Sequence, residues 1–169
     1  AGICVNDGKR LQIAKAKGRL ENLKRQLSDR PEGRGNVGIG HTRWATHGAP
    51  TIENSHPHLS ENGKFAVVHN GIIENYKELR EKLEKQGCNF RSQTDTETVA
   101  HLVASKYAQT KDLTEAVRLA TQELEGAYAL CVVHQDVKDT IVATRRNAPL
   151  LVGVGEGEYY LASDVPAII

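Results

Sequence analysis

Methionine is absent from this chain, and cysteine is scarce: 169 residues contain three cysteines and no methionine. Because even the first position is not methionine, we expect the sequence to be an excised or processed piece of a longer protein. Cys4, Cys88 and Cys131 are odd in number and irregularly spaced, which disfavours a disulfide framework. Their scarcity fits a reducing, cytoplasmic compartment.

Long apolar runs and charge of one sign are lacking too. The apolar run at 127–133 is far shorter than the ~20 residues of a membrane helix. The 22 basic and 21 acidic residues are spread along the chain, so no basic block favours nucleic acid. Neither a membrane nor a nucleic acid is therefore an expected partner. The length and composition are typical of one soluble globular domain.

The apolar pattern predicts strands first, then helices, then strands again. Periodic apolar positions predict helices that begin near Leu20, Asn75, Thr94 and Asp112. We expect Asn75 to cap its helix, with Glu78 three residues further on. Strands are predicted at 3–5, 11–13, 37–39, 65–68, 128–134, 140–144, 150–154 and 159–162. The short links between the last four predict antiparallel neighbours and an α+β fold.

One polar stretch stands out, at 41–48: His-Thr-Arg-Trp-Ala-Thr-His-Gly. It holds the only indole of the chain among imidazoles, hydroxyls and a guanidinium. Such groups are costly in an apolar core when left unpaired, about 1–3 kcal/mol each. The combination suits a site that grips a small charged ligand and covers it with a flat ring. Arg43 is the natural carboxylate receptor, with a structural ion pair as the alternative.

Two other stretches each allow two interpretations. Asn70 and Gly71 follow an apolar strand, so they either end it in an Asn-Gly turn or supply donors to an oxyanion hole. Asp95 lies between Thr94 and Glu97, which together form a capping box; alternatively, its carboxylate binds a ligand's ammonium group. From the local sequence alone, the turn and the cap are the simpler interpretations.

Metal and nucleotide sites need separate consideration. No carboxylate or cysteine has ligand spacing beside the histidines, and a Gly-x-Gly-x-x-Gly motif at 33–38 precedes a strand instead of following one. We expect neither a metal nor a cofactor, and histidines in polar loops more often serve as hydrogen-bonded groups. The five clustered histidines are His41, His47, His56, His58 and His69.

Four motifs occur in one order: 41–50, Asn-Ser-His-Pro-His at 54–58, His-Asn-Gly-Ile-Ile-Glu-Asn at 69–75, and Thr-Asp-Thr-Glu at 94–97. This series closely resembles the glutaminase domains of glucosamine-6-phosphate synthases, also called isomerising glutamine–fructose-6-phosphate aminotransferases. Gly-Ala-Tyr at 126–128 and Leu-Ala-Ser-Asp at 161–164 are similar to that family as well. The resemblance covers essentially the whole chain, and its first and third motifs are specific to the family.

The resemblance implies a four-layer α-β-β-α sandwich of largely antiparallel sheets, of the N-terminal nucleophile hydrolase type. It implies that 1–169 is a single class II glutamine amidotransferase domain that lacks its first strand and helix. The implied activity is hydrolysis of L-glutamine to glutamate and ammonia. The ammonia converts fructose 6-phosphate to glucosamine 6-phosphate in sugar isomerase domains, which are absent here. The implied parent enzyme is a homodimer.

The resemblance also implies residue roles. Arg43 would hold the α-carboxylate of glutamine with the help of Thr46 and His47, and Trp44 would belong to a loop that closes over the substrate. Asp95 would bind the α-ammonium group. The oxyanion hole would consist of Asn70 and Gly71. These assignments favour the functional interpretation of stretches whose local sequence favours a structural one.

In that family an N-terminal cysteine attacks the amide, and its own α-amine is the base. This chain begins Ala1-Gly2-Ile3, and we interpret that start as the family's second strand. Because a thiol and an α-amine are needed on one residue, none of the three cysteines can substitute. We therefore expect the polypeptide as written not to hydrolyse glutamine. The alternatives are a non-catalytic module that binds glutamine or glutamate, and a metal-binding histidine protein.

Overall fold

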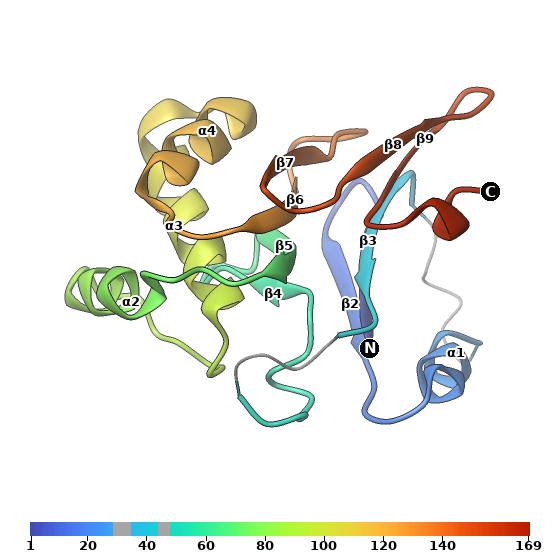
Figure 1. Ribbon diagram of the computed structural model, residues 1–169, viewed down its shortest axis with the longest axis horizontal. Helices are drawn as coiled ribbons and strands as arrows, with labels where there is room; N and C mark the ends of the chain where they lie inside the picture. Colours follow the sequence, from blue (N-terminus) through green and yellow to red (C-terminus); the bar gives the residue numbers. More distant parts are fainter. Residues whose placement is uncertain (29–34, 44–47) are drawn as a thin grey trace.

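A computed structural model of the chain describes residues 1–28, 35–43 and 48–169 (Figure 1). The elements in chain order are β1 (Gly2–Asn6), β2 (Leu11–Lys15), α1 (Leu20–Ser28), β3 (Val37–His41), β4 (His58–Leu59), β5 (Phe65–Gly71), α2 (Tyr76–Lys85), α3 (Asp95–Thr110), α4 (Leu113–Glu123), β6 (Tyr128–His134), β7 (Val142–Arg146), β8 (Leu151–Val154), β9 (Tyr159–Ala162) and the 3₁₀ helix η1 (Val165–Ala167). None of the described helices is long and apolar enough to cross a membrane.

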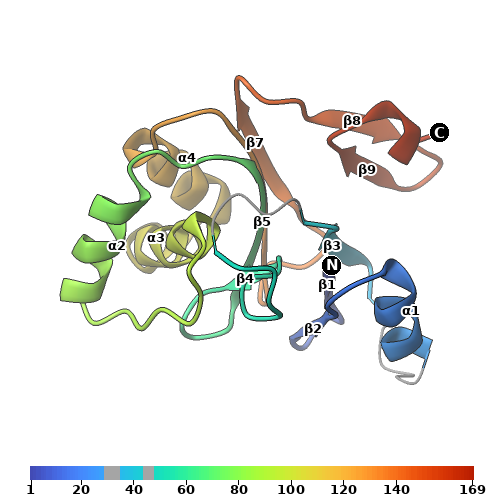
Figure 2. The ribbon, with the colours of Figure 1, turned by 60° about the horizontal axis from the view of Figure 1, so that its bottom comes forward.

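The strands form three antiparallel sheets, with the orders β2-β1-β3, β4-β5-β6-β7 and β8-β9. The predicted hairpin near the start of the chain is confirmed as β1–β2. The prediction that the last four strands are all neighbours is wrong between β7 and β8, since β8 and β9 form a sheet of their own. Figure 2 shows β8 and β9 away from α2, α3 and α4.

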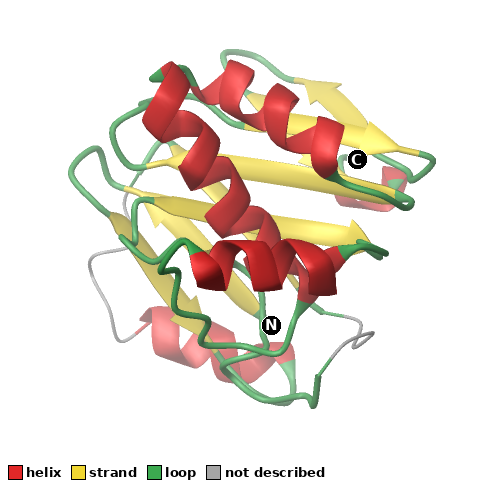
Figure 3. Cartoon of the chain, turned by 90° about the vertical axis from the view of Figure 1, so that its left-hand side faces the viewer, coloured by secondary structure: helices red, strands yellow, loops and turns green. Residues whose placement is uncertain are grey.

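Three apolar clusters separate four layers. The first lies between the four-stranded sheet and the helices α2, α3 and α4, which Figure 3 shows in front of the strands. The second lies between the two larger sheets, and the third lies between the three-stranded sheet and α1. Figure 1 shows α1 on the opposite side of the molecule from the other three helices. The predicted α-β-β-α layering and α+β class are confirmed.

Strand β5 contributes to two of these clusters. Phe65 and Val67 pack toward the helices, whereas Ala66 and Val68 pack toward the other sheet. This alternation follows from the period of two residues along a strand. The strand is therefore covered on both faces, and its polar end, at 69–71, lies where the two sheets meet.

Helix starts are mostly capped as the sequence predicts. The Thr94 hydroxyl accepts the N–H of Glu97 at the start of α3, and Asp112 accepts the N–H of Glu115 at the start of α4. The cap predicted for α2 is wrong: Asn75 makes no side-chain cap bond. Its side-chain amide instead donates to the carbonyl of Glu123 and accepts from the N–H of Glu125, at distances of 2.8 and 3.0 Å.

Strand β4 was not predicted, and β7 begins at Val142 instead of residue 140. The two residues of β4 are His58 and Leu59, which pair with Val67 and Ala66. Two residues are too short a segment for an alternating apolar pattern to be visible. Tertiary pairing with β5 therefore creates this strand.

Two glycines with positive φ provide a matched test of the backbone at the end of β5. Gly71 has φ +107°, and a Cβ there would lie 2.1 Å from the carbonyl oxygen of Ala127. Gly63 has φ +70°, with open space where its Cβ would be. We expect both alanine variants to show about 1–2 kcal/mol of left-handed strain, and Gly71→Ala to lose clearly more free energy of unfolding because of the clash. Urea denaturation checks this; equal losses would contradict the described approach of the two backbones.

Candidate active site at the end of strand β5

Asn70 and Gly71 are the last residues of β5, paired in register with Ala129 and Tyr128 of β6. The N–H of Ile72 continues this ladder by donating to the carbonyl of Ala127 at 3.1 Å. The alternative interpretation, in which Asn70 and Gly71 form a strand-ending turn, does not hold, because the pairing runs through them. Since N–H directions alternate along an antiparallel strand, the N–H of Gly71 points away from β6.

The N–H groups of His69 and Ile73, two residues before and two residues after Gly71, point to the same side of β5 as the N–H of Gly71. The N–H of His69 donates to Nδ1 of His56 at 3.3 Å, and the N–H of Ile73 donates to Oδ2 of Asp95 at 2.9 Å. Gly71 itself is exposed. On this side of β5, the N–H of the exposed Gly71 thus lies between two N–H groups that donate to the buried side chains of His56 and Asp95.

Asn70 follows Val68 by two residues, so its side chain lies on the same face of β5, between the two sheets. Its Oδ1 is 2.6 Å from Nε2 of His41, the last residue of β3. The other ring nitrogen of His41, Nδ1, accepts the backbone N–H of Arg43 at 2.8 Å. His41 therefore joins the end of one sheet to the end of the other.

A cavity of about 430 Å³ opens beside these residues. It is bounded by the ends of β3, β5, β6 and β9, and its lining includes His41, Thr42, Asn70, Cys131 and Ser163. Polar groups thus converge on a hollow large enough for a small molecule.

Arg43 has a left-handed backbone, with φ 62°. Its guanidinium donates to the backbone carbonyls of Ala49 at 2.9 Å and Gly48 at 3.3 Å. This side chain therefore joins the residues before and after 44–47. The roles predicted for Trp44, Thr46 and His47 concern residues outside the described part of the chain.

Asp95 is the first residue of α3 and is 3% exposed. Besides accepting from Ile73, its Oδ2 lies 3.8 Å from Nδ1 of His69. Thr94, not Asp95, supplies the helix cap. The Asp95 carboxylate therefore contacts the loop that follows Gly71 and lies close to the motif at 69–75.

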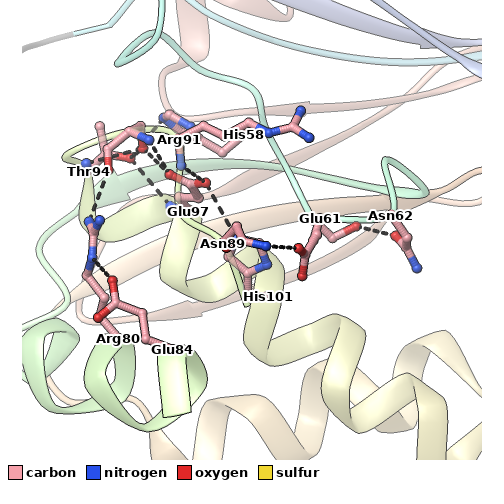
Figure 4. Close-up of polar contacts among 12 residues, drawn as sticks. His58, Glu61, Asn62, Arg80, Glu84, Asn89, Arg91, Thr94, Glu97 and His101 are labelled. Carbon is pink, nitrogen blue, oxygen red and sulfur yellow. Dashed lines mark hydrogen bonds and ion pairs between the residues drawn. The ribbon is translucent and has the colours of Figure 1, made fainter. Parts of the chain in front are cut away.

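Glu97 is the centre of a buried polar cluster at the start of α3 (Figure 4). Its carboxylate accepts the N–H of Arg91 at 2.8 Å, the N–H and hydroxyl of Ser92 at 2.6 and 2.5 Å, and Nε2 of His101 at 3.4 Å. The capping box predicted from Thr94 and Glu97 is therefore only half correct. The N–H of Thr94 instead donates to the Ser92 hydroxyl, which leaves the carboxylate to organise the loop at 91–94.

Burial and hydrogen bonding shift several pKa values in this region. Burial alone would raise the pKa of Glu97, but hydrogen bonds from His101, Ser92 and Arg91 outweigh it and lower the pKa to about 2. Burial, with the charge of Lys15 nearby, lowers the pKa of His58 to about 3. Burial is also the main cause that lowers the pKa of His41. A charged Glu97 and neutral His41 and His58 are therefore the states that the fold favours.

The clustered histidines bond to hydroxyl groups and stack on one another. Nε2 of His58 lies 3.0 Å from Oγ1 of Thr94, and Nδ1 of His69 lies 2.9 Å from Oγ1 of Thr96. The rings of His41 and His56 stack with centroids 4.3 Å apart. Among the residues that the structure describes, no three His, Cys, Asp or Glu side chains are grouped to hold a metal ion.

The sequence predicts only that His41, like the other clustered histidines, is hydrogen-bonded, and it does not indicate the partners. The spacing of His41 to Arg43, two residues on, was an available signal, because a short side chain acceptor can reach the N–H two residues further along. The contact with Asn70 spans 29 residues and could not be found from local sequence.

The fold is that of solved amidotransferases. Bacillus subtilis glutamine phosphoribosylpyrophosphate amidotransferase, solved with ADP and GMP, superposes with a TM-score of 0.76 and 30% identity over 95% of this chain and 34% of that chain. A structure described as the allosteric regulatory enzyme of purine biosynthesis gives a TM-score of 0.79 and 31% identity, covering 96% of this chain and 35% of that one.

The chain belongs to the glutamine amidotransferase domain family, whose model matches residues 41–169. It is 55% identical to the isomerising glutamine–fructose-6-phosphate aminotransferase of Streptomyces coelicolor and 56% identical to that of Symbiobacterium thermophilum, over all 169 residues. The chain spans 28% and 27% of the lengths of these two relatives.

The Glu97 cluster predicts a specific loss of stability in acid. Because the pKa of Glu97 falls from 4.5 to about 2 on folding, its contribution is complete above pH 4.5 and is lost as the pH falls toward 2. We expect Glu97→Gln to lower the free energy of unfolding by about 1–3 kcal/mol at pH 7. The difference from the wild type should shrink between pH 4.5 and pH 2 in urea titrations.

Glu84→Gln is the matched control, since Glu84 pairs with Arg80 on the exposed face of α2 (Figure 4). An exposed pair of this kind contributes little, so the control should change stability by less than about 0.5 kcal/mol. A pH-independent difference between wild type and Glu97→Gln would show that the charge of Glu97 is not stabilised by folding.

Proposed function

We propose that this chain is the glutamine-hydrolysing domain of an enzyme that makes glucosamine 6-phosphate from fructose 6-phosphate. Membership of the amidotransferase family and the identity to isomerising aminotransferases over the full chain support this proposal. Sugar isomerase domains of the parent enzyme, which is a homodimer, receive the ammonia. The three free cysteines fit a cytoplasmic location.

The observation that carries the proposal is the donor pair at the end of β5. The N–H of Gly71 points away from β6, and Oδ1 of Asn70 faces His41, so the Asn70 amide turns its Nδ2 donors elsewhere. Donors fixed beside a cavity stabilise the negative charge that develops on a carbonyl oxygen during acyl transfer. Asn70 and Gly71 are therefore the proposed oxyanion hole.

The two charged ends of glutamine need partners of opposite charge. Arg43 binds the α-carboxylate, because a guanidinium matches a carboxylate in a bidentate pair; Thr46 and His47 assist, and Trp44 closes over the substrate. Asp95 binds the α-ammonium group. Its bond to the N–H of Ile73 supports this assignment, because it ties the ammonium partner to the loop that follows the oxyanion hole.

None of the three cysteines in the chain is suited to attack the substrate. Burial raises the pKa of Cys4 to about 12 and that of Cys131 to about 11, and it also raises the pKa of Cys88. A thiol nucleophile requires access to its thiolate form. The attacking cysteine, whose own α-amine is the base, is therefore proposed to lie outside these 169 residues, and the chain alone is proposed to be inactive.

The reaction then follows from the proposed groups. The thiolate forms a C–S bond to the side-chain amide carbon, and the carbonyl electron pair moves to oxygen, where Asn70 and Gly71 donate hydrogen bonds. Collapse of this intermediate breaks the C–N bond once the nitrogen is protonated, which releases ammonia and leaves a thioester. Attack by water on the thioester then releases glutamate and the thiol.

A non-catalytic binding module is the second candidate, favoured by the raised pKa values of the three thiols. Calorimetry with L-glutamate and a glutaminase assay on the isolated chain separate the two properties. We expect no glutamate production by the chain alone. Turnover above background would contradict the proposed external nucleophile.

In the parent enzyme, Asn70→Ala should lower kcat for glutamine hydrolysis by about 10²–10³-fold, the usual loss when one oxyanion donor is removed. Asn89→Ala removes an exposed amide that bonds to Glu61 and should leave kcat unchanged. Glutamate release is the measurement. Full activity of Asn70→Ala would overturn the oxyanion assignment.

Cys131 needs its own test because it lines the same cavity as Asn70. If the nucleophile lies elsewhere, Cys131→Ser in the parent enzyme retains glutaminase activity, since burial keeps this thiol protonated. Complete loss of glutamate release, with an unchanged melting temperature, would instead identify Cys131 as the nucleophile.

A further inference from the structure

We propose that His41 is a positioning residue for the oxyanion site, where its neutral imidazole holds the Asn70 amide with the Nδ2 donors turned toward the cavity. This inference rests on the proposed function, in which Asn70 donates to the oxyanion. It is carried by one chain of contacts: Arg43 N–H to His41 Nδ1 at 2.8 Å, and His41 Nε2 to Asn70 Oδ1 at 2.6 Å.

The first contact sets the tautomer of His41. A backbone N–H can only donate, so Nδ1 of His41 must be the unprotonated, accepting nitrogen. A neutral imidazole then carries its hydrogen on Nε2. That hydrogen faces the side chain of Asn70, and only the amide oxygen of Asn70 can accept it. The orientation of the amide is therefore fixed, because its oxygen faces His41 and its NH₂ group faces away.

A doubly protonated His41 ring could not make both of these contacts. With a hydrogen on each nitrogen, Nδ1–H would face the N–H of Arg43, and two donors would lie opposite each other without an acceptor. Burial lowers the pKa of His41 and outweighs the hydrogen bonds to Asn70 and His69, which raise it; the nearby charges of the Ala1 amine and Arg43 lower it further. The surroundings thus favour the one neutral tautomer that can orient Asn70.

Two further contacts keep the ring and the Arg43 N–H in place. The His41 ring stacks on His56 with an interplanar angle of 19°. Arg43 adopts a left-handed backbone, and its guanidinium is bonded to the carbonyls of Gly48 and Ala49. A left-handed conformation at a residue other than glycine costs free energy and persists where its surroundings hold it. His41 therefore links the proposed carboxylate receptor to the oxyanion hole.

The test compares His41→Phe, His41→Gln, Asn70→Ala and the double variant His41→Phe/Asn70→Ala in the parent enzyme. His41→Phe keeps a flat ring but loses both nitrogens, and it should lower kcat by roughly tenfold to a hundredfold, with KM for glutamine changed less than about twofold. His41→Gln keeps a donor near the Nε2 position and should recover part of the loss. The double variant should be no slower than Asn70→Ala, because both changes disable one donor.

His134→Phe is the matched control. The N–H of Asp136 donates to Nδ1 of His134 at 3.0 Å, which is the same local bond over two residues. His134 is buried and lies against Phe65 and Tyr107. This control removes a comparable histidine without touching Asn70, so kcat should be unchanged.

The outcomes separate the inference from the proposed function. Full activity of Asn70→Ala would remove the oxyanion assignment itself. If that variant is slow and His41→Phe multiplies its loss in full, His41 does not act through Asn70 and the inference is wrong. ¹⁵N NMR of the unmodified enzyme at pH 7 provides a check that needs no variant to fold. It should show His41 with Nε2 protonated and Nδ1 bare, and the opposite tautomer or an imidazolium would overturn the inference.

Discussion

Burial of β5 on both faces is the constraint on which the rest of the structure depends. Helices α2, α3 and α4 cover one face and the three-stranded sheet covers the other, so the strand can expose polar groups only at its ends. At one end, the amide of Asn70 meets His41. Near the other end, the Asn6 side chain donates to the carbonyls of His134 and Gln135 at 3.1 and 3.2 Å. These three bonds join the two sheets where apolar packing stops.

The same constraint explains the buried polar layer behind the site. A buried polar group without a partner costs about 1–3 kcal/mol. Several residues around the start of α3 avoid this cost by forming hydrogen bonds with neighbouring groups. Glu97 gathers the loop at 91–92, Thr94 caps the helix, and Asp95 holds the N–H of Ile73. The loop after Gly71 is thereby fixed to α3. This contact makes the end of β5 rigid, and hydrogen-bond donors of an active site need such rigid support.

Much of the fold follows from local pattern, because the short apolar runs of β5 and β6 indicate buried strands and the apolar spacing in α3 indicates a helix. The layering and the family could be predicted from the order of the motifs. Other features depend on contacts between distant residues: β4 exists through its pairing with β5, Asn75 bonds to 123 and 125 instead of capping α2, and Ser92 takes the N–H that a capping box would give to Glu97. The partnership of His41 with Asn70 is of the same kind, since no local rule relates residues 29 positions apart.

We propose that Gly71 and Asn70, whose amide is oriented by His41, together stabilise the negative charge of the tetrahedral intermediate formed from glutamine. A crystal structure of the parent enzyme with a glutamine-derived aldehyde, trapped as a tetrahedral thiol adduct, tests this most directly. We expect the adduct oxygen at about 2.7–3.1 Å from both Nδ2 of Asn70 and the backbone nitrogen of Gly71, with Oδ1 of Asn70 still hydrogen-bonded to His41. An adduct oxygen that contacts neither donor would contradict it.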